Sequence, residues 1–168
     1  MPYIINPCLH ASLVTGLDID NYSADNPEVV FSLRKISSSY SGNCIKVRRS
    51  SDNATQDIGF TGGLGTWLDD SAISTFIGGG TGYVDTWYDQ SGNGYNVSQA
   101  TLTEQPVLIA DVFSLTGGTA YSLSFAGTND NLYHDAGSNI LSNKASFTAL
   151  IALRDAGGGF ASSWSFNR

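Results

Sequence analysis

The stretch Trp87–Asn96 gathers the side chains of this chain that could bind a ligand or do chemistry. It reads Trp-Tyr-Asp-Gln-Ser-Gly-Asn-Gly-Tyr-Asn, so a carboxylate, carboxamides, a hydroxyl and three aromatic rings follow one another closely. A strand-like run, residues 83–88, ends in this polar turn, which two glycines punctuate. The stretch must therefore be weighed as a catalytic site, a ligand-binding site and a structural turn.

A catalytic role would require a second acid at a suitable distance from Asp89. Asp85 lies on the same face of an extended strand, four positions earlier, which separates the two by about 13 Å at the rise of a strand. Glycosidases place their two carboxyl groups roughly 5–9.5 Å apart. Asp52 and Asp57 lie in or beside turns, where local hydrogen bonds explain them. We therefore expect no catalytic residue and class the protein as non-enzymatic.

The same stretch fits a structural turn as well as a sugar-binding surface. In a structural turn, Asp89 and Ser91 accept backbone N–H groups, while Gly92 and Gly94 supply positive φ angles. In a sugar-binding surface, one of the aromatic rings stacks on a pyranose. The candidate ligand-binding residues are Trp87, Tyr88, Asp89, Gln90, Tyr95 and Asn96. The structural role is favoured because it explains the stretch without a ligand.

The composition offers little support for other kinds of site. The net charge is −7, from eight basic and fifteen acidic residues, whereas a nucleic-acid binder needs a basic surface. Cys8 and Cys44 are the only cysteines; one disulfide is open to them, but two free thiols are favoured. With only His10 and His134 besides, no zinc-type spacing appears. We expect no metal, no cofactor and no nucleic-acid partner.

The start of the chain predicts an extended arm rather than a targeting signal. Residues 1–7 lack the basic and apolar regions of a signal peptide, and no apolar run is long enough to span a bilayer. Prolines at positions 2 and 7 forbid early helix. We expect residues 1–25 to dock on their own domain, a neighbouring subunit or a particle, and the chain to be made in the cytoplasm without membrane insertion.

Roughly nine short strands are predicted for the remainder of the chain. The clearest fall near residues 29–34, 44–49, 56–60, 83–88, 107–109, 121–125, 146–153 and 159–166. In the run 44–49, Ile45 and Val47 share one face, while Lys46 and Arg48 share the other. That alternation predicts a sheet with one buried face and with both basic side chains in solvent.

One short helix is predicted near residues 69–77. Asp69 or Asp70 can cap its N-terminus, and Gly78 stops it. Many short strands with a single helix indicate an all-β protein, a β-sandwich or jelly roll over residues 26–168. Because residues 147–153 resemble a central strand only about fifteen residues before the end, we expect this sandwich to be C-terminally incomplete.

Several ordered blocks of the sequence resemble a known family. They are Val30–Lys35, Tyr40–Gly42, Val47–Asn53, Gln56–Gly59, Trp87–Gly94, Gln105–Pro106 and Leu123–Gly127. Residues 29–127 resemble the first part of the arabinofuranosidase B catalytic domain, glycoside hydrolase family 54. They look still closer to bacteriophage virion and prophage proteins with a concanavalin A-like, LamG-type domain. The resemblance implies that fold for this chain.

The resemblance also sets the functional expectation. In the hydrolase family both catalytic carboxylates lie downstream of the matched region, and the family's vicinal cysteine pair has no counterpart here, so no catalytic residue carries over. We expect a phage structural protein of the virion, displayed on capsid or tail as a decoration, fibre or receptor-binding element. Its partners would be other virion proteins, further copies of itself (a trimer among the options) and host-surface glycans. The alternatives are a carbohydrate-binding module and a truncated arabinofuranosidase-like glycoside hydrolase.

Overall fold

The computed structural model describes residues 27–61, 67–115, 118–125 and 129–134, without the side chains of residues 111–120. All of these residues belong to the first of two compact units, Met1–Asp135. The predicted arm, residues 1–25, and the predicted strands at 146–153 and 159–166 lie outside the described residues. Within the described ranges, no helix is long and apolar enough to cross a membrane.

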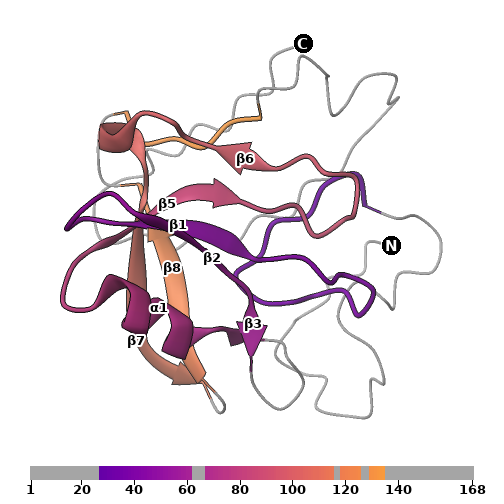
Figure 1. The fold of residues 1–168 in the computed structure, drawn as a ribbon. Coiled ribbons are helices and arrows are strands. Elements are labelled where there is room, and N and C mark those ends of the chain that lie inside the picture. Colours follow the sequence, from indigo (N-terminus) through magenta and orange to yellow (C-terminus); the bar gives the residue numbers. More distant parts are fainter. Residues whose placement is uncertain (1–26, 62–66, 116–117, 126–128, 135–168) are drawn as a thin grey trace, which may run out of the picture. The chain divides into compact units, whose positions relative to one another are not determined.

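Two antiparallel sheets and one α-helix make up the described part (Figure 1). The larger sheet has six strands in the order β2-β1-β5-β7-β8, with β6 also paired to β5, and the smaller sheet joins β3 to β4. The strands are β1 Ile45–Arg49, β2 Thr55–Ile58, β3 Phe60–Thr61, β4 Trp67–Leu68, β5 Gly82–Trp87, β6 Val97–Ser98, β7 Val107–Leu115 and β8 Gly118–Ser124. For the described residues, the prediction of a mostly β fold with one short helix is confirmed.

The helix α1, Asp70–Ile77, begins and ends where its sequence signals place it. The Asp69 side chain accepts the backbone N–H of Ala72 at 3.0 Å, so Asp69 is the N-cap of the two predicted candidates. At the other end Gly78 has φ 59° and donates its N–H to Ser74 O. A residue with a side chain would be strained at that φ, which is why glycine ends the helix.

One face of the larger sheet carries the hydrophobic core. Its buried members are Cys44, Ile45, Val47, Ile58, Leu68, Ile73, Val84 and Leu108. Helix α1 packs against β1 and β2 and brings Ile73 to this face. At Gly82 the approach is close: a Cβ atom there would come within 3.2 Å of Val47 and 3.3 Å of Ile77. The missing side chain of Gly82 thus lets the helix end pack directly on the sheet.

The opposite face of the same sheet is polar, and part of it is covered. Lys46 lies between Asp57 of β2 and Thr86 of β5 in the strand register. Arg48 is only 5% exposed, so the prediction that it lies in solvent is wrong. The reason is a 3₁₀ turn, η2 at Leu102–Glu104, which provides the carbonyl of Leu102 as an acceptor for the guanidinium.

Residues 29–34 do not form the strand that their apolar alternation predicted. Within them only Arg34 makes a ladder contact, an isolated bridge to Trp67. The rest of the segment runs beside β5 and the turn that follows it without joining the sheet. Its backbone groups are held by side chains of that turn.

Candidate functional site

Asp89 is the centre of the turn that follows β5, and it is 3% exposed. Its carboxylate accepts four hydrogen bonds: from the N–H groups of Val30 at 2.8 Å, Ser91 at 2.8 Å and Tyr95 at 3.1 Å, and from the Ser91 hydroxyl at 2.6 Å. The Asp89 N–H donates to the side-chain oxygen of Asn96 at 2.9 Å. A buried carboxylate is tolerated only when donors replace water, and here all four come from the chain itself.

Gln90 is likewise interior, at 2% exposed. Its side-chain nitrogen donates to the carbonyls of Ser32 at 2.8 Å and Arg34 at 2.9 Å, and its side-chain oxygen accepts the Ile36 N–H at 3.1 Å. Its backbone N–H donates to the carbonyl of Val30 at 2.8 Å. Both amide protons and the amide oxygen of the side chain are therefore engaged by one short segment of backbone.

Two further side chains of the turn reach the start of that segment. The Asn93 amide donates to the carbonyl of Glu28 at 2.9 Å, and the Ser91 hydroxyl oxygen lies 3.2 Å from the same carbonyl. Gly92 and Gly94 have φ angles of 89° and 80°, which only glycine adopts without strain. The glycines let the turn reverse tightly enough to aim Ser91 and Asn93 back at Glu28.

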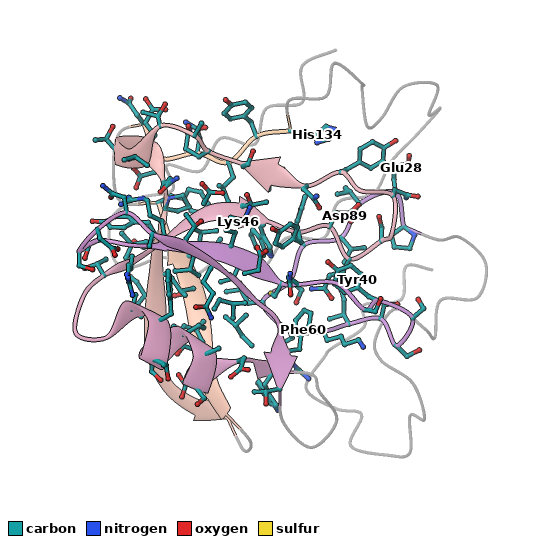
Figure 2. All side chains as sticks on the ribbon, viewed as in Figure 1. Glu28, Tyr40, Lys46, Phe60, Asp89 and His134 are labelled. Carbon is teal, nitrogen blue, oxygen red and sulfur yellow. The ribbon has the colours of Figure 1, made fainter. Side chains whose placement is uncertain are left out.

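These four side chains, Asp89, Gln90, Ser91 and Asn93, are here called the clamp. The backbone groups they hold belong to residues 28, 30, 32, 34 and 36, every second residue of an extended segment. In an extended chain the N–H and C=O groups of alternate residues point to one side. The clamp therefore takes the place of a partner strand, and Figure 2 shows Asp89 and Glu28 at the same end of the sheet.

The predicted aromatic ligand contacts Trp87 and Tyr88 are partly buried and engaged in the fold. The Trp87 ring lies 5.5 Å from the ring of Phe31, and its N–H points at the carbonyl of Ser32 at 3.4 Å. The Tyr88 hydroxyl donates to an exposed carboxylate, Asp57, at 2.6 Å. Burial, together with that carboxylate, raises the pKa of the Tyr88 phenol.

Tyr95 and Asn96 lie on the other side of the turn. The Tyr95 ring meets the ring of His134 edge to face, with 5.4 Å between centroids. His134 Nδ1 lies 2.8 Å from the carbonyl of Asn96, so this nitrogen carries the proton that the carbonyl accepts. Ligand binding by the six candidate residues stays a prediction, and for Asp89 and Gln90 the contacts made are all internal.

A second buried polar cluster was not predicted. Arg48 donates from Nε to Gln105 at 2.6 Å, and Gln105 in turn donates to the carbonyl of Gln99 at 2.7 Å. Gln99, 2% exposed, donates to the side-chain oxygens of Asn131 at 2.7 Å and Glu104 at 3.1 Å. Nothing in the sequence near these isolated polar residues marks them as neighbours, because they come from three distant segments. The cluster fastens residues 129–134 and η2 to the sheet.

Seven carboxylates of the described part have partners within the chain. Asp52 pairs with Arg49, Asp57 with Tyr88, Asp69 with the start of α1, Asp70 with Tyr121, Asp85 with Thr86, Asp89 with the clamp contacts and Glu104 with Gln99. Among the described residues no group of three or more His, Cys, Asp or Glu side chains could hold a metal ion. In the described part, the polar side chains of the turn thus bind other parts of the fold, and the partly buried aromatic rings beside them are the groups that a ligand could contact.

Comparison with known proteins gives a family match. The family model "Alpha-L-arabinofuranosidase B, catalytic" matches residues 20–129. Among solved structures, an arabinofuranosidase complexed with arabinofuranosyl-α-1,2-xylobiose is 31% identical, with a TM-score of 0.55 over 64% of this chain. This chain spans only 25% of that enzyme. No curated protein matches.

Two further solved structures are similar over a shorter part of the chain. One is a glycoside hydrolase family 54 α-L-arabinofuranosidase soaked with a cyclic sulfate inhibitor, and the other a mutant of such an enzyme soaked with 4-nitrophenyl α-L-arabinofuranoside. Each is 37% identical with a TM-score of 0.45, over 50% of this chain and 18% of the other.

Proposed function

The chain belongs to the alpha-L-arabinofuranosidase B catalytic family, and we propose that it is a carbohydrate-binding module. In this proposal residues 27–134 bind arabinofuranosyl glycans and do not cleave them. The family match over residues 20–129 supports a sugar ligand. The solved relative with a TM-score of 0.55 is a complex with arabinofuranosyl-α-1,2-xylobiose. That oligosaccharide therefore defines the ligand class proposed for this chain.

The proposal that the chain binds glycans without hydrolysing them rests on one observation: the fold itself uses the Asp89 carboxylate as a hydrogen-bond acceptor. Glycoside hydrolysis needs two carboxyl groups that face the sugar, one of them to donate a proton and one to attack or to activate water. Asp89 is buried and accepts four internal hydrogen bonds. Releasing it toward a sugar would leave the N–H groups of Val30, Ser91 and Tyr95 without an acceptor, so we assign Asp89 to the scaffold.

The proposed sugar contacts are the partly exposed aromatic residues of the turn. A tyrosine ring offers an apolar face to a sugar ring and a hydroxyl to its oxygens. Tyr88 presents such a ring beside the exposed carboxylate of Asp57, and Lys46 is the strand neighbour of Asp57. Ring, carboxylate and ammonium together suit a polyhydroxylated ligand. Tyr95 is a second candidate ring, at the far side of the same turn.

A concanavalin A-like sandwich is the architecture we propose for the complete fold. Its support is the similarity to the arabinofuranosidase complex, 31% identical with a TM-score of 0.55. The described sheet also buries one apolar face, from which the core side chains Ile45, Val47 and Val84 project. A sheet with one apolar face fits a two-layer arrangement.

The test measures binding and hydrolysis side by side. Titration of the full chain with arabinofuranosyl-xylobiose should give saturable binding, while 4-nitrophenyl α-L-arabinofuranoside should release no nitrophenol above the buffer rate. Tyr88→Ala should weaken binding about tenfold, the loss of about 1.4 kcal/mol that one stacked ring supplies. Phe125→Ala, which removes an aromatic side chain that is 50% exposed elsewhere, should leave the affinity unchanged. Absence of binding, or enzymatic turnover of the nitrophenyl substrate, would overturn the proposal.

The virion interpretation is the second candidate, and it rests on the sequence resemblance alone. If the chain is a phage structural protein, mass spectrometry of purified virions should detect it in stoichiometric amounts. Size-exclusion chromatography with light scattering should then show an oligomer, a trimer among the options. A carbohydrate-binding module is expected to be a monomer under the same conditions. A stable monomer missing from every virion preparation would remove this candidate.

A further inference from the structure

The Asn93–Gly94 pair combines a reactive sequence with an open geometry. It is the one Asn–Gly step in the sequence. Both residues are exposed, Gly94 has φ 80°, and a Cβ atom placed on it would meet nothing within 4 Å. Because glycine has no side chain, its backbone nitrogen can approach the amide carbon of the preceding asparagine with little steric hindrance. We propose that Asn93 is a site of spontaneous deamidation, and that the reaction loosens the clamp on residues 28–36.

The chemistry needs no enzyme and no oxidant. The backbone nitrogen of Gly94 attacks the Cγ atom of Asn93 and loses its proton to solvent, so a new N–Cγ bond closes a five-membered succinimide. The bond between Cγ and the side-chain nitrogen breaks, and ammonia leaves. Water then opens the ring at either carbonyl, which gives aspartate or isoaspartate at position 93. One ammonia is released and one water is consumed.

The product cannot make the contact that Asn93 makes. The Asn93 amide donates a hydrogen bond to the carbonyl of Glu28 at 2.9 Å. A carboxylate only accepts, so its oxygens would face the Glu28 carbonyl oxygen. The Asp89 carboxylate lies in the same turn and adds like-charge repulsion, because the Ser91 hydroxyl that donates to it also lies 3.2 Å from the Glu28 carbonyl that the Asn93 side chain contacts. Isoaspartate also lengthens the backbone of a turn built around the positive φ of Gly94.

The same contact makes the reaction rate a measure of clamp opening. While the clamp is closed, the hydrogen bond to the Glu28 carbonyl restricts the rotation of the Asn93 side chain. When residues 28–36 leave the clamp, the amide is released and can adopt the geometry that the attack requires. Deamidation should therefore run faster in a variant with a weakened clamp, such as Asp89→Asn.

The first test follows deamidation by peptide mapping of the full chain, kept warm at mildly alkaline pH. Asn53, in an exposed turn with φ 60° and followed by alanine, is the internal control. The Asn93 peptide should gain aspartate and isoaspartate roughly tenfold or more faster than the Asn53 peptide, because Ala54 has the side chain that Gly94 lacks. Equal rates at the two positions, or no conversion at Asn93, would overturn the proposal. Asp89→Asn should raise the Asn93 rate several-fold; an unchanged rate would overturn the link to the clamp.

The second test introduces the product directly. Asn93→Asp should lower the Tm by about 2–4 °C, the shift expected for one lost hydrogen bond in a chain of this size. Gln56→Glu makes the same change of charge at an exposed position of β2 and should leave the Tm nearly unchanged. If Asn93→Asp melts with the wild-type protein, the proposed effect on the clamp is wrong.

Discussion

The Asp89 carboxylate lies 2.8 Å from the backbone nitrogen of Val30, across 59 positions of sequence. This contact is one of several by which side chains hold an extended segment outside the sheets in place. Gln90 repeats the arrangement two to six residues further on, at the backbone of Ser32, Arg34 and Ile36. Side chains thus do for residues 28–36 what a neighbouring strand does for β1.

Replacing the carboxylate tests this arrangement at its centre. Asp89→Asn keeps the shape but turns one oxygen into a donor, which then faces donors. We expect the free energy of unfolding to fall by about 2–4 kcal/mol, the range for a buried charged acceptor that loses its partners. Urea denaturation measures the loss. Asp57→Asn, an exposed carboxylate with the Tyr88 hydroxyl as its described partner, is the control and should cost less than about 1 kcal/mol. Similar losses in the two variants would contradict the role of Asp89.

Arg48 offers a second test, because its guanidinium is buried and shared among neutral acceptors. It donates to Gln105, Asn53 and the carbonyl of Leu102, and it lies 4.3 Å over the ring of Tyr83. Lysine keeps the charge but cannot fork to three acceptors or stack. Arg48→Lys should therefore cost about 2–3 kcal/mol in unfolding free energy.

The control for Arg48 lies two residues earlier on the same sheet face. Lys46→Arg should change the unfolding free energy by less than about 0.5 kcal/mol, as expected for a partly exposed position. Thermal unfolding of both variants under one set of conditions gives the comparison. If Arg48→Lys leaves the unfolding free energy unchanged, the hydrogen bonds that the Arg48 guanidinium makes do not stabilise the fold as proposed.

The sequence predicts best where a signal is local. Alternation along residues 44–49 indicated β1, and an acidic cap with a glycine stop indicated α1, because both patterns arise from neighbouring residues. For Arg48 the alternation predicted the correct face of the sheet, but it wrongly predicted that the side chain lies in solvent. What covers that face is η2, more than fifty residues further on, and no local pattern reports it.

The candidate site shows the same limit. The turn at Ser91, Gly92 and Gly94 can be predicted from the residue types, since short polar side chains and glycines favour such turns. The segment that this turn holds, residues 28–36, contains residues 29–34, which were predicted instead as a strand. Apolar alternation marks an extended backbone, and it does not distinguish a partner strand from side chains such as Gln90 that satisfy the same backbone groups.

The turn after β1 contains a pH-dependent contact. The Arg49 guanidinium holds the pKa of Asp52 well below its usual range, at about 2, with help from the N–H of Ala54. A carboxyl group with a lowered pKa contributes stability above its unfolded pKa, about 3.9, and loses it as the pH falls through the folded value. The Tm difference between the wild type and Asp52→Asn should therefore be constant above about pH 5 and shrink toward pH 2. A difference that grows on acidification would contradict this assignment.

Cys44 is a free thiol at 0% exposure, and its S–H donates to the carbonyl of Ser32 at 3.2 Å. Burial raises the pKa of this thiol, and only the thiolate reacts with alkylating agents. In native protein at mildly alkaline pH, iodoacetamide should label Cys44 at least about 100-fold more slowly than in denaturant. Peptide mapping resolves Cys44 from Cys8. Native labelling within a few-fold of the denatured rate would show that the thiol is accessible.

The central claim is that the clamp, formed by Asp89, Gln90, Ser91 and Asn93, holds the segment before β1 in place, and amide hydrogen exchange at Val30 tests it most directly. In the wild type the Val30 amide should be protected as strongly as the Val84 amide of β5, which donates to Pro106. In Asp89→Asn, Val30 should lose most of its protection while Val84 keeps its own. A Val30 amide that exchanges freely in the wild type, or that stays protected in the variant, would contradict the clamp.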